Sequence, residues 1–226
     1  MKINAVKTNL VLCLVLLAGQ HGKSQGTFSN FDFESAIPPF NPDLFGEVPI
    51  SSALPGWTAY INGTPRDRVL YNDSSLGGPS VSLFDSLSPF PSLRPLEGSY
   101  SVYLHAGAGI GQTGRVPDGT ASLTFLISPG SALNVSFAGQ NIPLVQFGTS
   151  GNNTIIAGNI SRFAGQTGEL RFLGGGLFDD VRFSTSAIPE PGAVSMFCIG
   201  AVFIVVRGWK LGGRGRRSEV GQTSNR

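Results

Sequence analysis

The chain has 226 residues and a formal net charge of +2, but its charges are segregated along the sequence. Residues 26–187 carry seven arginines and twelve acidic side chains, a balance of 7 − 12 = −5, whereas residues 207–226 carry six basic side chains and one glutamate, a balance of 6 − 1 = +5. This segregation excludes a basic nucleic-acid-binding domain, whose cations would cluster on the folded body, so we expect no nucleic-acid partner.

Residues 1–25 show the three parts of a secretory signal peptide. Lys2 and Lys7 precede an apolar run at 10–18, and small and polar residues follow it as far as Gly26. The run is too short to cross a membrane as a helix, which needs about 20 apolar residues. We therefore expect residues 1–25 to be removed as the chain crosses the inner membrane.

Residues 26–187 have the composition of a β-rich secreted domain. The whole chain has only 13% charged residues, against about 25% in typical soluble proteins, and it contains 31 glycines and 16 phenylalanines. Its two cysteines, Cys13 and Cys198, lie in apolar runs outside this segment. The sequence thus excludes a disulfide framework and a thiolate metal site within residues 26–187.

Short strands separated by Gly, Pro and Asn turns are expected throughout residues 26–187. Apolar residues alternate with other residues most clearly in 99–105, 121–127 and 133–137, and no segment keeps a helical period of 3.6 residues. Weaker strand candidates are 27–34, 56–61, 67–72, 80–85, 143–147, 154–160, 168–173 and 177–184. Roughly ten strands of this kind predict an all-β fold, an antiparallel two-sheet sandwich.

A second apolar run, 193–206, lies near the C-terminus and predicts a single transmembrane helix. At 1.5 Å per residue this run makes about 21 Å of helix, shorter than the roughly 30 Å hydrocarbon core of a bilayer. The tripeptide Pro189-Glu190-Pro191 precedes the run. The basic residues that follow it would hold this end on the cytoplasmic side, and they include Arg207, Arg214, Arg216 and Arg217.

This order of tripeptide, apolar helix and basic cluster over residues 188–217 resembles the PEP-CTERM sorting signal of Gram-negative bacterial surface proteins. The resemblance implies recognition by an exosortase, a membrane cysteine protease-transpeptidase, followed by processing near the tripeptide. It also implies delivery to the cell surface or the extracellular polysaccharide matrix. Residues 218–226 form a polar tail, although the family usually ends a few residues after its basic cluster. The alternative is a plain single-pass anchor without processing.

Two short motifs in the body resemble the first and last strands of galactose-binding-like jelly rolls. They are Asn30-Phe31-Asp32-Phe33-Glu34, followed by Pro55-Gly56-Trp57, and the sequence FDDVRFS at 178–184. The resemblance implies a jelly-roll sandwich whose terminal strands lie close together. It also implies a structural calcium ion held by Glu34 and Asp180, with Asp32 or Asp179 as further ligands. The alternative is that these carboxylates only solvate the outer face of edge strands.

The sequence favours a non-catalytic role for the body. His105 is the only histidine in residues 26–187, and we expect it at the end of a strand before a glycine turn. The glycine-rich segment 107–111 lacks the lysine of a phosphate-binding loop, and no G-x-S-x-G motif is present. Nothing in the sequence fixes the separation of a carboxylate pair such as Asp67 and Asp85 for glycoside hydrolysis. We therefore expect a surface or matrix protein that is not an enzyme.

Glycan binding in the cell envelope or the extracellular polysaccharide is the alternative function. Aromatic side chains with nearby hydrogen-bonding groups can hold sugar rings. We expect Trp57 in the core, and Tyr103 exposed because it lies opposite the apolar side chains of its strand. The candidate sugar-binding residues are Tyr60, Tyr71 and Tyr103, with Arg66, Arg68 and Asn72 nearby in the sequence.

Overall fold

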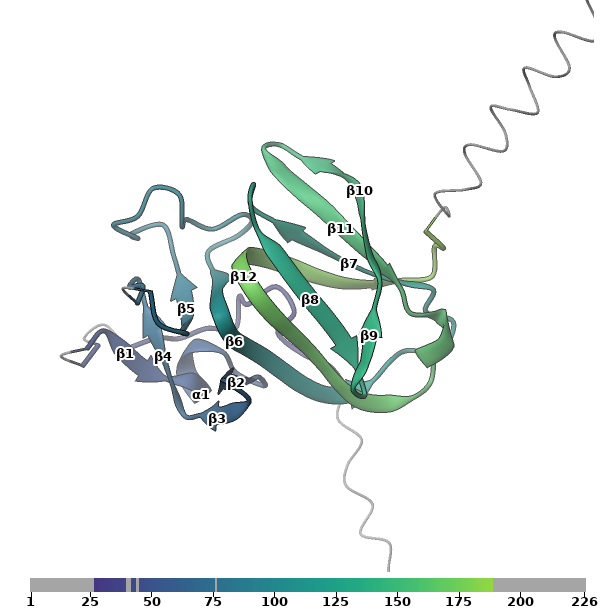
Figure 1. Ribbon diagram of the computed structural model, residues 1–226, viewed down its shortest axis with the longest axis horizontal. Coiled ribbons are helices and arrows are strands. Elements are labelled where there is room, and N and C mark those ends of the chain that lie inside the picture. The colour runs from purple at the N-terminus through teal and green to yellow at the C-terminus, as the bar shows by residue number, and fades with distance from the viewer. Residues whose placement is uncertain (1–26, 40–41, 44, 76, 189–226) are drawn as a thin grey trace, which may run out of the picture.

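The computed structural model describes residues 27–188 except residues 40, 41, 44 and 76. An all-β body is confirmed, because these residues form strands with almost no helix (Figure 1). The helical elements are α1 (Ile50–Ala53) and the 3-10 turn η1 (Ser161–Phe163). The strands are β1 (Glu47–Pro49), β2 (Thr58–Ile61), β3 (Thr64–Arg66), β4 (Arg68–Tyr71), β5 (Val81–Phe84), β6 (Ser101–Arg115), β7 (Ser122–Ile127), β8 (Ala132–Phe137), β9 (Gln140–Ile142), β10 (Leu144–Ser150), β11 (Asn153–Asn159) and β12 (Thr167–Ser184).

All of these strands belong to one hydrogen-bonded mixed sheet. Its main order is β1-β4-β5-β6-β12-β7-β11-β10, with β2 and β3 attached to β6 and with β8 and β9 attached to β12. The pairs are antiparallel, as expected, with the exception of β4 and β5. These two strands run parallel through the residue pairs Leu70–Ser82 and Tyr71–Leu83.

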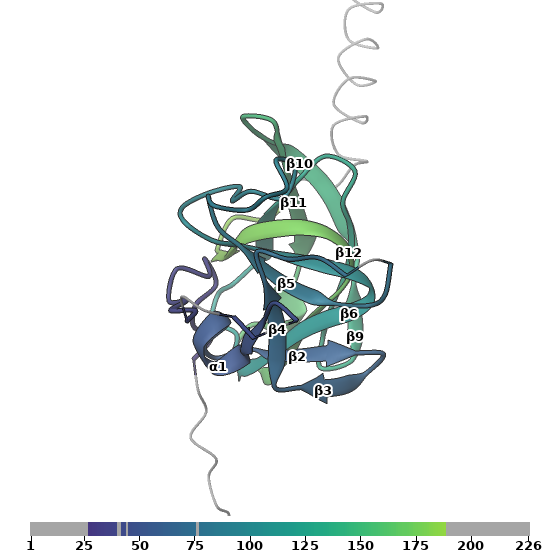
Figure 2. The same ribbon diagram turned by 90° about the vertical axis from the view of Figure 1, so that its left-hand side faces the viewer.

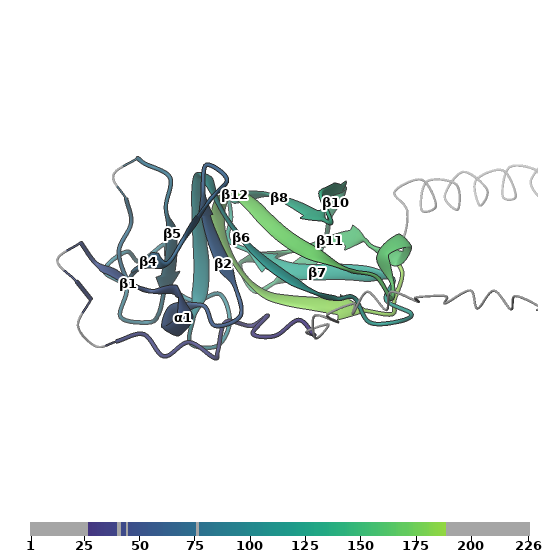
Figure 3. The same ribbon diagram turned by 90° about the horizontal axis from the view of Figure 1, so that it is seen from below.

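The long strands β6 and β12 run side by side and bend, so the sheet folds over on itself (Figure 3). The rings of Phe172 and Phe178 lie 4.9 Å apart on β12, although six residues of straight strand would span about 20 Å. The bend falls at Gly174 and Gly176, whose φ angles of 150° and 155° favour glycine, and a side chain at Gly176 would collide with Ser131. Instead of two separate sheets, β6 and β12 therefore contribute to both halves of one sheet.

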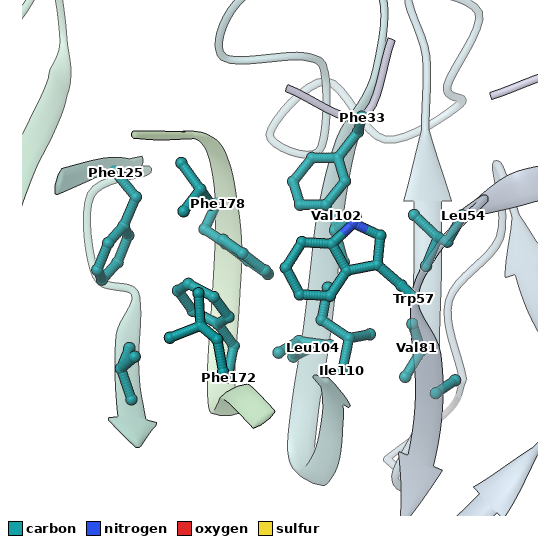
Figure 4. Packing of buried hydrophobic residues seen from close by; sticks show 14 of the residues in the cluster. Phe33, Leu54, Trp57, Val81, Val102, Leu104, Ile110, Phe125, Phe172 and Phe178 are labelled. Atoms are coloured by element: carbon teal, nitrogen blue, oxygen red, sulfur yellow. The ribbon is translucent and has the colours of Figure 1, made fainter. Parts of the chain in front are cut away.

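The apolar core lies inside this fold of the sheet (Figure 4). Trp57 is in the core, as expected, with its ring 5.8 Å from Phe33 and 6.1 Å from Phe172. Each such aromatic side chain stabilises the fold by roughly 1.5–3 kcal/mol on burial. One row of paired, fully buried residues crosses β2, β6, β12, β8 and β9 and consists of Ala59, Ile110, Phe172, Val135 and Ile142.

Residues 27–34 do not form the expected first strand. The structure gives them one β-bridge, between Thr27 and Arg115, and positive φ angles at Asn30 and Phe33 interrupt the extended chain. The segment still lies beside the last strand, because the backbone oxygen of Phe31 accepts a hydrogen bond from the backbone nitrogen of Val181 at 3.0 Å. The first and last described segments are therefore neighbours, as the jelly-roll resemblance implied.

The proposed signal peptide and the C-terminal apolar run lie outside the described residues. Within the described ranges, none of the helices has the length and apolar character that a membrane crossing requires. Figure 2 shows the body from the side, with α1, β2 and β3 at one end and β10 and β11 at the other.

Candidate functional site

Five carboxylates gather around one pocket of about 170 Å³. The pocket lies where the N-terminal segment, the loop before β6 and the C-terminal half of β12 meet. It contains all four carboxylates that the jelly-roll resemblance named, together with one that the sequence did not indicate. The lining residues are Asp32, Glu34, Glu97, Gly98, Asp179, Asp180 and Arg182.

A β-bulge in β12 places Asp180 at this pocket. The pairing of β12 with β7 shifts between Asp179 and Arg182, so two residues, Asp180 and Val181, lie opposite a single residue of β7. Asp180 has a φ of 51°, in the left-handed region. In a regular strand, two residues three positions apart would face opposite sides of the sheet. Phe178 and Val181 are nevertheless both buried in the core, because the bulge between them adds one residue and resets the alternation.

Asp179 is the most buried of the five carboxylates, with 1% of its surface exposed. Its oxygens accept hydrogen bonds from Ser101 Oγ at 2.5 Å and from the backbone nitrogens of Glu97 at 3.2 Å and Asp180 at 2.6 Å. Burial raises the pKa of Asp179 to about 7, against the lowering effect of these hydrogen bonds. Asp179 thereby connects the loop before β6 to the bulge in β12.

Glu34 anchors the N-terminal segment to the same loop. Its Oε1 accepts hydrogen bonds from the backbone nitrogens of Ser99 at 2.7 Å and Tyr100 at 3.1 Å. Gly98 has a φ of 58°, and a side chain at Gly98 would collide with the Glu34 carboxylate. The loop therefore needs glycine at this position to receive Glu34.

The chemistry of this pocket fits calcium, which prefers hard oxygen ligands. Asp180 Oδ1 accepts a 2.6 Å hydrogen bond from Arg182 Nε, and Asp32 Oδ1 accepts one from the backbone of Glu34. Asp32, Glu34 and Asp180 each keep one oxygen for which the described residues supply no donor. Among those same residues, no group of three or more acidic, histidine or cysteine side chains is arranged to hold a metal ion. The calcium site therefore stays a prediction.

Tyr60 is engaged by partners from β12. Its hydroxyl donates a 2.8 Å hydrogen bond to Glu169 Oε1, and the guanidinium of Arg171 lies 4.0 Å from the centre of its ring. Burial raises the pKa of Tyr60, and the hydrogen bond to Glu169 adds to this effect. One face of the Tyr60 ring is thus covered by Arg171.

Tyr71 and Tyr103 are half-buried and also have partners within the chain. The Tyr71 hydroxyl donates a 2.5 Å hydrogen bond to Asp85 Oδ2, and burial holds the pKa of Tyr71 well above its usual range. Tyr103 lies edge-on against Phe84 and His105, with ring centres 6.4 and 4.8 Å apart. The three tyrosines named for glycan binding therefore lie on β2, β4 and β6 in separate surroundings, and they do not form one aromatic surface.

A cavity of about 880 Å³ lies between β4, β5 and the segment that joins them. Because β4 and β5 run parallel, the chain must return along β4 between Tyr71 and Val81 before it enters β5. The cavity forms between this crossover and the strands, in a part of the chain where we had expected antiparallel neighbours. Its apolar lining consists of Phe45, Ile61, Val69, Leu70, Pro79, Val81 and Phe90.

Two arginines line the cavity and differ in their partners. Arg68 donates a 2.5 Å hydrogen bond to Asp43 Oδ2 and one of 2.8 Å to the backbone oxygen of Glu47, whose carboxylate lies 3.4 Å away. Arg66 is exposed and forms no ion pair with any of the described residues. The hydroxyl groups of the cavity come from the crossover and belong to Ser74, Ser75 and Ser80.

His105 does not end a strand, because β6 continues from Ser101 to Arg115. Its Nε2 lies 2.9 Å from Ser74 Oγ, at the edge of the cavity. The glycine-rich segment 107–111 belongs to the same strand and is not a loop. Strand alternation did not reveal this continuity, since a bent strand with several glycines gives no regular apolar pattern.

The other enzyme candidates have structural partners or lie apart from the cavity. Asp85 accepts hydrogen bonds from Tyr71 and from Asn72 Nδ2 at 2.7 Å, which ties β5 to the end of β4. Asp67 is exposed between β3 and β4, and its backbone oxygen accepts a hydrogen bond from the backbone nitrogen of Ile50 at 2.9 Å. Neither carboxylate lines the cavity. The sorting residues 189–191 and 207–217 lie outside the described residues.

No protein-family model matches the chain, and no curated protein sequence matches it. Among solved structures, the chain is similar to the Stig cyclase Fisc from Fischerella sp. TAU in complex with (3Z)-3-(1-methyl-2-pyrrolidinylidene)-3H-indole. The two share 17% sequence identity with a TM-score of 0.43, and the alignment covers 69% of this chain and 93% of that chain. At this distance neither fold nor function is transferred from that protein.

Proposed function

We propose that the chain is a secreted, non-catalytic protein of the surface or extracellular matrix of a Gram-negative bacterium, delivered by a PEP-CTERM sorting signal. The observation that carries this proposal is the order of Pro-Glu-Pro, apolar run and basic cluster over residues 188–217, behind a signal peptide at 1–25. The apolar run and basic cluster hold the exported chain in the inner membrane transiently. The partner that then processes the chain is an exosortase-type transpeptidase.

The position of the last strand supports this proposal. Strand β12 ends at Ser184, so residues 185–188 separate it from Pro189. Processing near the tripeptide would leave every strand of the described sheet in place. The released body would carry the acidic balance of residues 26–187, and its basic tail would stay behind.

We assign the body to a jelly-roll sandwich similar to galactose-binding-like domains. Support comes from the sheet that folds over one core, and from the contact between the first and last segments at Phe31 and Val181. The non-catalytic part of the proposal is supported by the engagement of Asp85 with Tyr71 and Asn72. Hydrolase activity of the purified chain that is lost on Ser74→Ala or Asp85→Asn would contradict it.

The sorting proposal is tested by replacing Pro189, Glu190 and Pro191 with alanine in a host that has an exosortase. We expect the wild-type chain to reach the surface in a processed form, and the variant to accumulate unprocessed in the inner membrane. Thr185→Ala, in the same linker but outside the tripeptide, is the matched control and should be processed normally. Normal processing of the alanine variant, or of the wild type in a host without an exosortase, would contradict the proposal.

The basic cluster has its own test. Replacing Arg207, Arg214, Arg216 and Arg217 with glutamine removes the charges that keep this end in the cytoplasm. We expect the variant chain to be released without processing, and its full C-terminus would then be found outside the inner membrane. Retention and processing at the wild-type level would show that these residues are not part of the signal.

Glycan binding is the second candidate function, and the cavity between β4 and β5 favours it. At about 880 Å³ the cavity falls within the roughly 300–1,000 Å³ typical of small-molecule sites, and it combines apolar walls with a few polar groups. The three tyrosines named from the sequence are engaged elsewhere. We therefore place the proposed glycan site in the cavity rather than at Tyr60, Tyr71 and Tyr103.

The structural calcium ion is proposed for the pocket that contains Glu34 and Asp180. Its ligands would be Asp32, Glu34 and Asp180, through the oxygens for which the described residues supply no donor. Calcium should raise the melting temperature of the wild-type chain relative to the chelated protein, because a ligand of the folded state stabilises it by mass action. The increase should vanish in Glu34→Gln and Asp180→Asn but persist in the control Asp118→Asn. An equal increase in all of these proteins would contradict the site.

A further inference from the structure

We infer that the cavity between β4 and β5 is a binding site for a carboxylated sugar, such as a uronate in an acidic polysaccharide. This inference is independent of the sorting proposal, and it specifies the ligand class for the glycan-binding alternative. It rests on three features of the cavity: a cation that forms no ion pair with the described residues, three serine hydroxyl groups and an exposed aromatic side chain.

The cation is Arg66 on β3. In residues 26–187 there are seven arginines, and two of them line this cavity. Arg68 is held by Asp43 and Glu47, so its charge is balanced within the chain. Arg66 forms no ion pair with the part of the chain that the structure describes. A planar guanidinium with free N–H groups binds a carboxylate through two parallel hydrogen bonds, which selects a carboxylated ligand over a neutral one.

Arg68, the second arginine of the cavity, helps to fix the shape of this site. Arg68 donates hydrogen bonds to Asp43 at 2.5 Å and to the Glu47 backbone at 2.8 Å, and these bonds hold the first residue of β4 in a defined position. Asp73 and Glu47 line the same cavity, but Glu47 faces Arg68, and Asp73 Oδ1 accepts a 2.7 Å hydrogen bond from the backbone of Ser74. Of the two arginines that line the cavity, Arg66 is the one without an ion pair among the described residues, so a ligand carboxylate would pair with it.

The hydroxyl groups come from the crossover between β4 and β5, whose serines line the cavity. Ser80 Oγ donates a 3.1 Å hydrogen bond to Ser75 Oγ, and Ser74 Oγ lies 2.9 Å from His105 Nε2. The first contact orients the hydroxyls of Ser75 and Ser80 relative to one another, and the second holds the hydroxyl of Ser74 against His105. Hydroxyl groups can both donate and accept, which matches the many hydroxyl groups of a sugar ring.

The aromatic side chain is Phe45, which is 77% exposed at the wall of the cavity. Covering the exposed ring of a phenylalanine with a ligand removes apolar surface from water and favours binding. The apolar face of a sugar ring is a suitable partner for this contact. Phe90 and Ile61 line the same cavity. The combination of one guanidinium, several hydroxyl groups and an aromatic face thus fits an acidic sugar better than it fits an inorganic anion or a lipid.

The test is isothermal titration of the full chain in detergent with trigalacturonate, compared with its methyl ester, which keeps the ring and hydroxyl groups but loses the charges. We expect saturable binding of the acid and at least tenfold weaker binding of the ester. Arg66→Gln should weaken binding of the acid at least tenfold, about 1.4 kcal/mol, and leave binding of the ester unchanged. Phe45→Ala should weaken both ligands.

The matched control is Arg94→Gln, which removes an exposed arginine that does not line the cavity. This variant should bind the acid like the wild type. Equal losses in Arg66→Gln and Arg94→Gln would indicate unspecific charge attraction and overturn the inference. Equal binding of acid and ester, or no binding of either, would overturn it as well, and surface sorting would be unaffected by these outcomes.

Discussion

The acidic pocket at the bulge of β12 and the arginine-lined cavity beside β4 are both polar. They differ in how many hydrogen-bond and ion-pair partners the described residues give to their charged side chains. In the pocket, Asp179 accepts three hydrogen bonds and Glu34 accepts two from backbone nitrogens. In the cavity, Arg68 is paired, whereas Arg66 has no partner among the described residues. A carboxyl group that is hydrogen-bonded on several sides connects segments of the fold, and an exposed charge that no described residue pairs is available to a ligand.

The largest expected effect concerns the pH dependence of the pocket. Burial raises the pKa of Asp179 from an ordinary value of 3.8 to about 7, so the folded state favours the protonated form. Its contribution to stability is therefore complete below pH 4 and is lost as the pH rises towards 7. In chelator-treated protein, the free energy of unfolding should fall by on the order of 3–4 kcal/mol over this range.

Urea unfolding at a series of pH values measures this dependence. Asp179→Asn, which cannot ionise, should abolish the decrease, whereas the exposed control Asp118→Asn should retain it. A wild-type stability that is constant or rises between pH 4 and 7 would contradict the role assigned to Asp179. It would also show that the three hydrogen bonds outweigh burial at this site.

The next effect compares the two arginines of the cavity. Arg68→Gln should lower the free energy of unfolding by about 1 kcal/mol, because it leaves Asp43 and Glu47 without their cation on a partly exposed surface. Arg66→Gln should change it by less than about 0.5 kcal/mol. Thermal unfolding of both variants provides the comparison. A larger loss for Arg66 than for Arg68 would reverse their proposed roles.

The smallest effect concerns the anchor of the N-terminal segment. Glu34→Gln keeps an oxygen for the backbone nitrogens of Ser99 and Tyr100 but removes the charge, so we expect a loss of about 0.5–1 kcal/mol without calcium. Hydrogen exchange should show faster opening of these two amides only. Faster exchange throughout β12 would mean that Glu34 supports the whole fold rather than one loop.

Most strands could be predicted from the sequence, because alternation reports which residues face the core. The segments 67–72, 80–85, 121–127 and 133–137 correspond closely to β4, β5, β7 and β8. The candidates 168–173 and 177–184 are one strand, β12, since the glycines between them bend the strand instead of ending it. Alternation also missed the short strands β1, β3 and β9, whose three residues are too few to show a pattern.

The candidate sites were predictable only where sequence neighbours or a known motif indicated them. The motifs around Glu34 and Asp180 indicated carboxylates that the structure brings to one pocket. The cavity was not predictable, because it depends on the parallel pairing of β4 with β5 and therefore on long-range register. The signal available was the concentration of Arg66, Arg68 and three serines between positions 66 and 80.

The pocket and the cavity both belong to the acidic body, which we propose is separated from its basic tail at the cell surface. The intact mass of the protein released from the surface tests this claim most directly. The account predicts a chain that begins after the signal peptide, ends near residues 189–191 and lacks residues 193–226. A surface-released chain that still contains residues 193–226 would contradict the account and identify the C-terminal segment as a plain anchor.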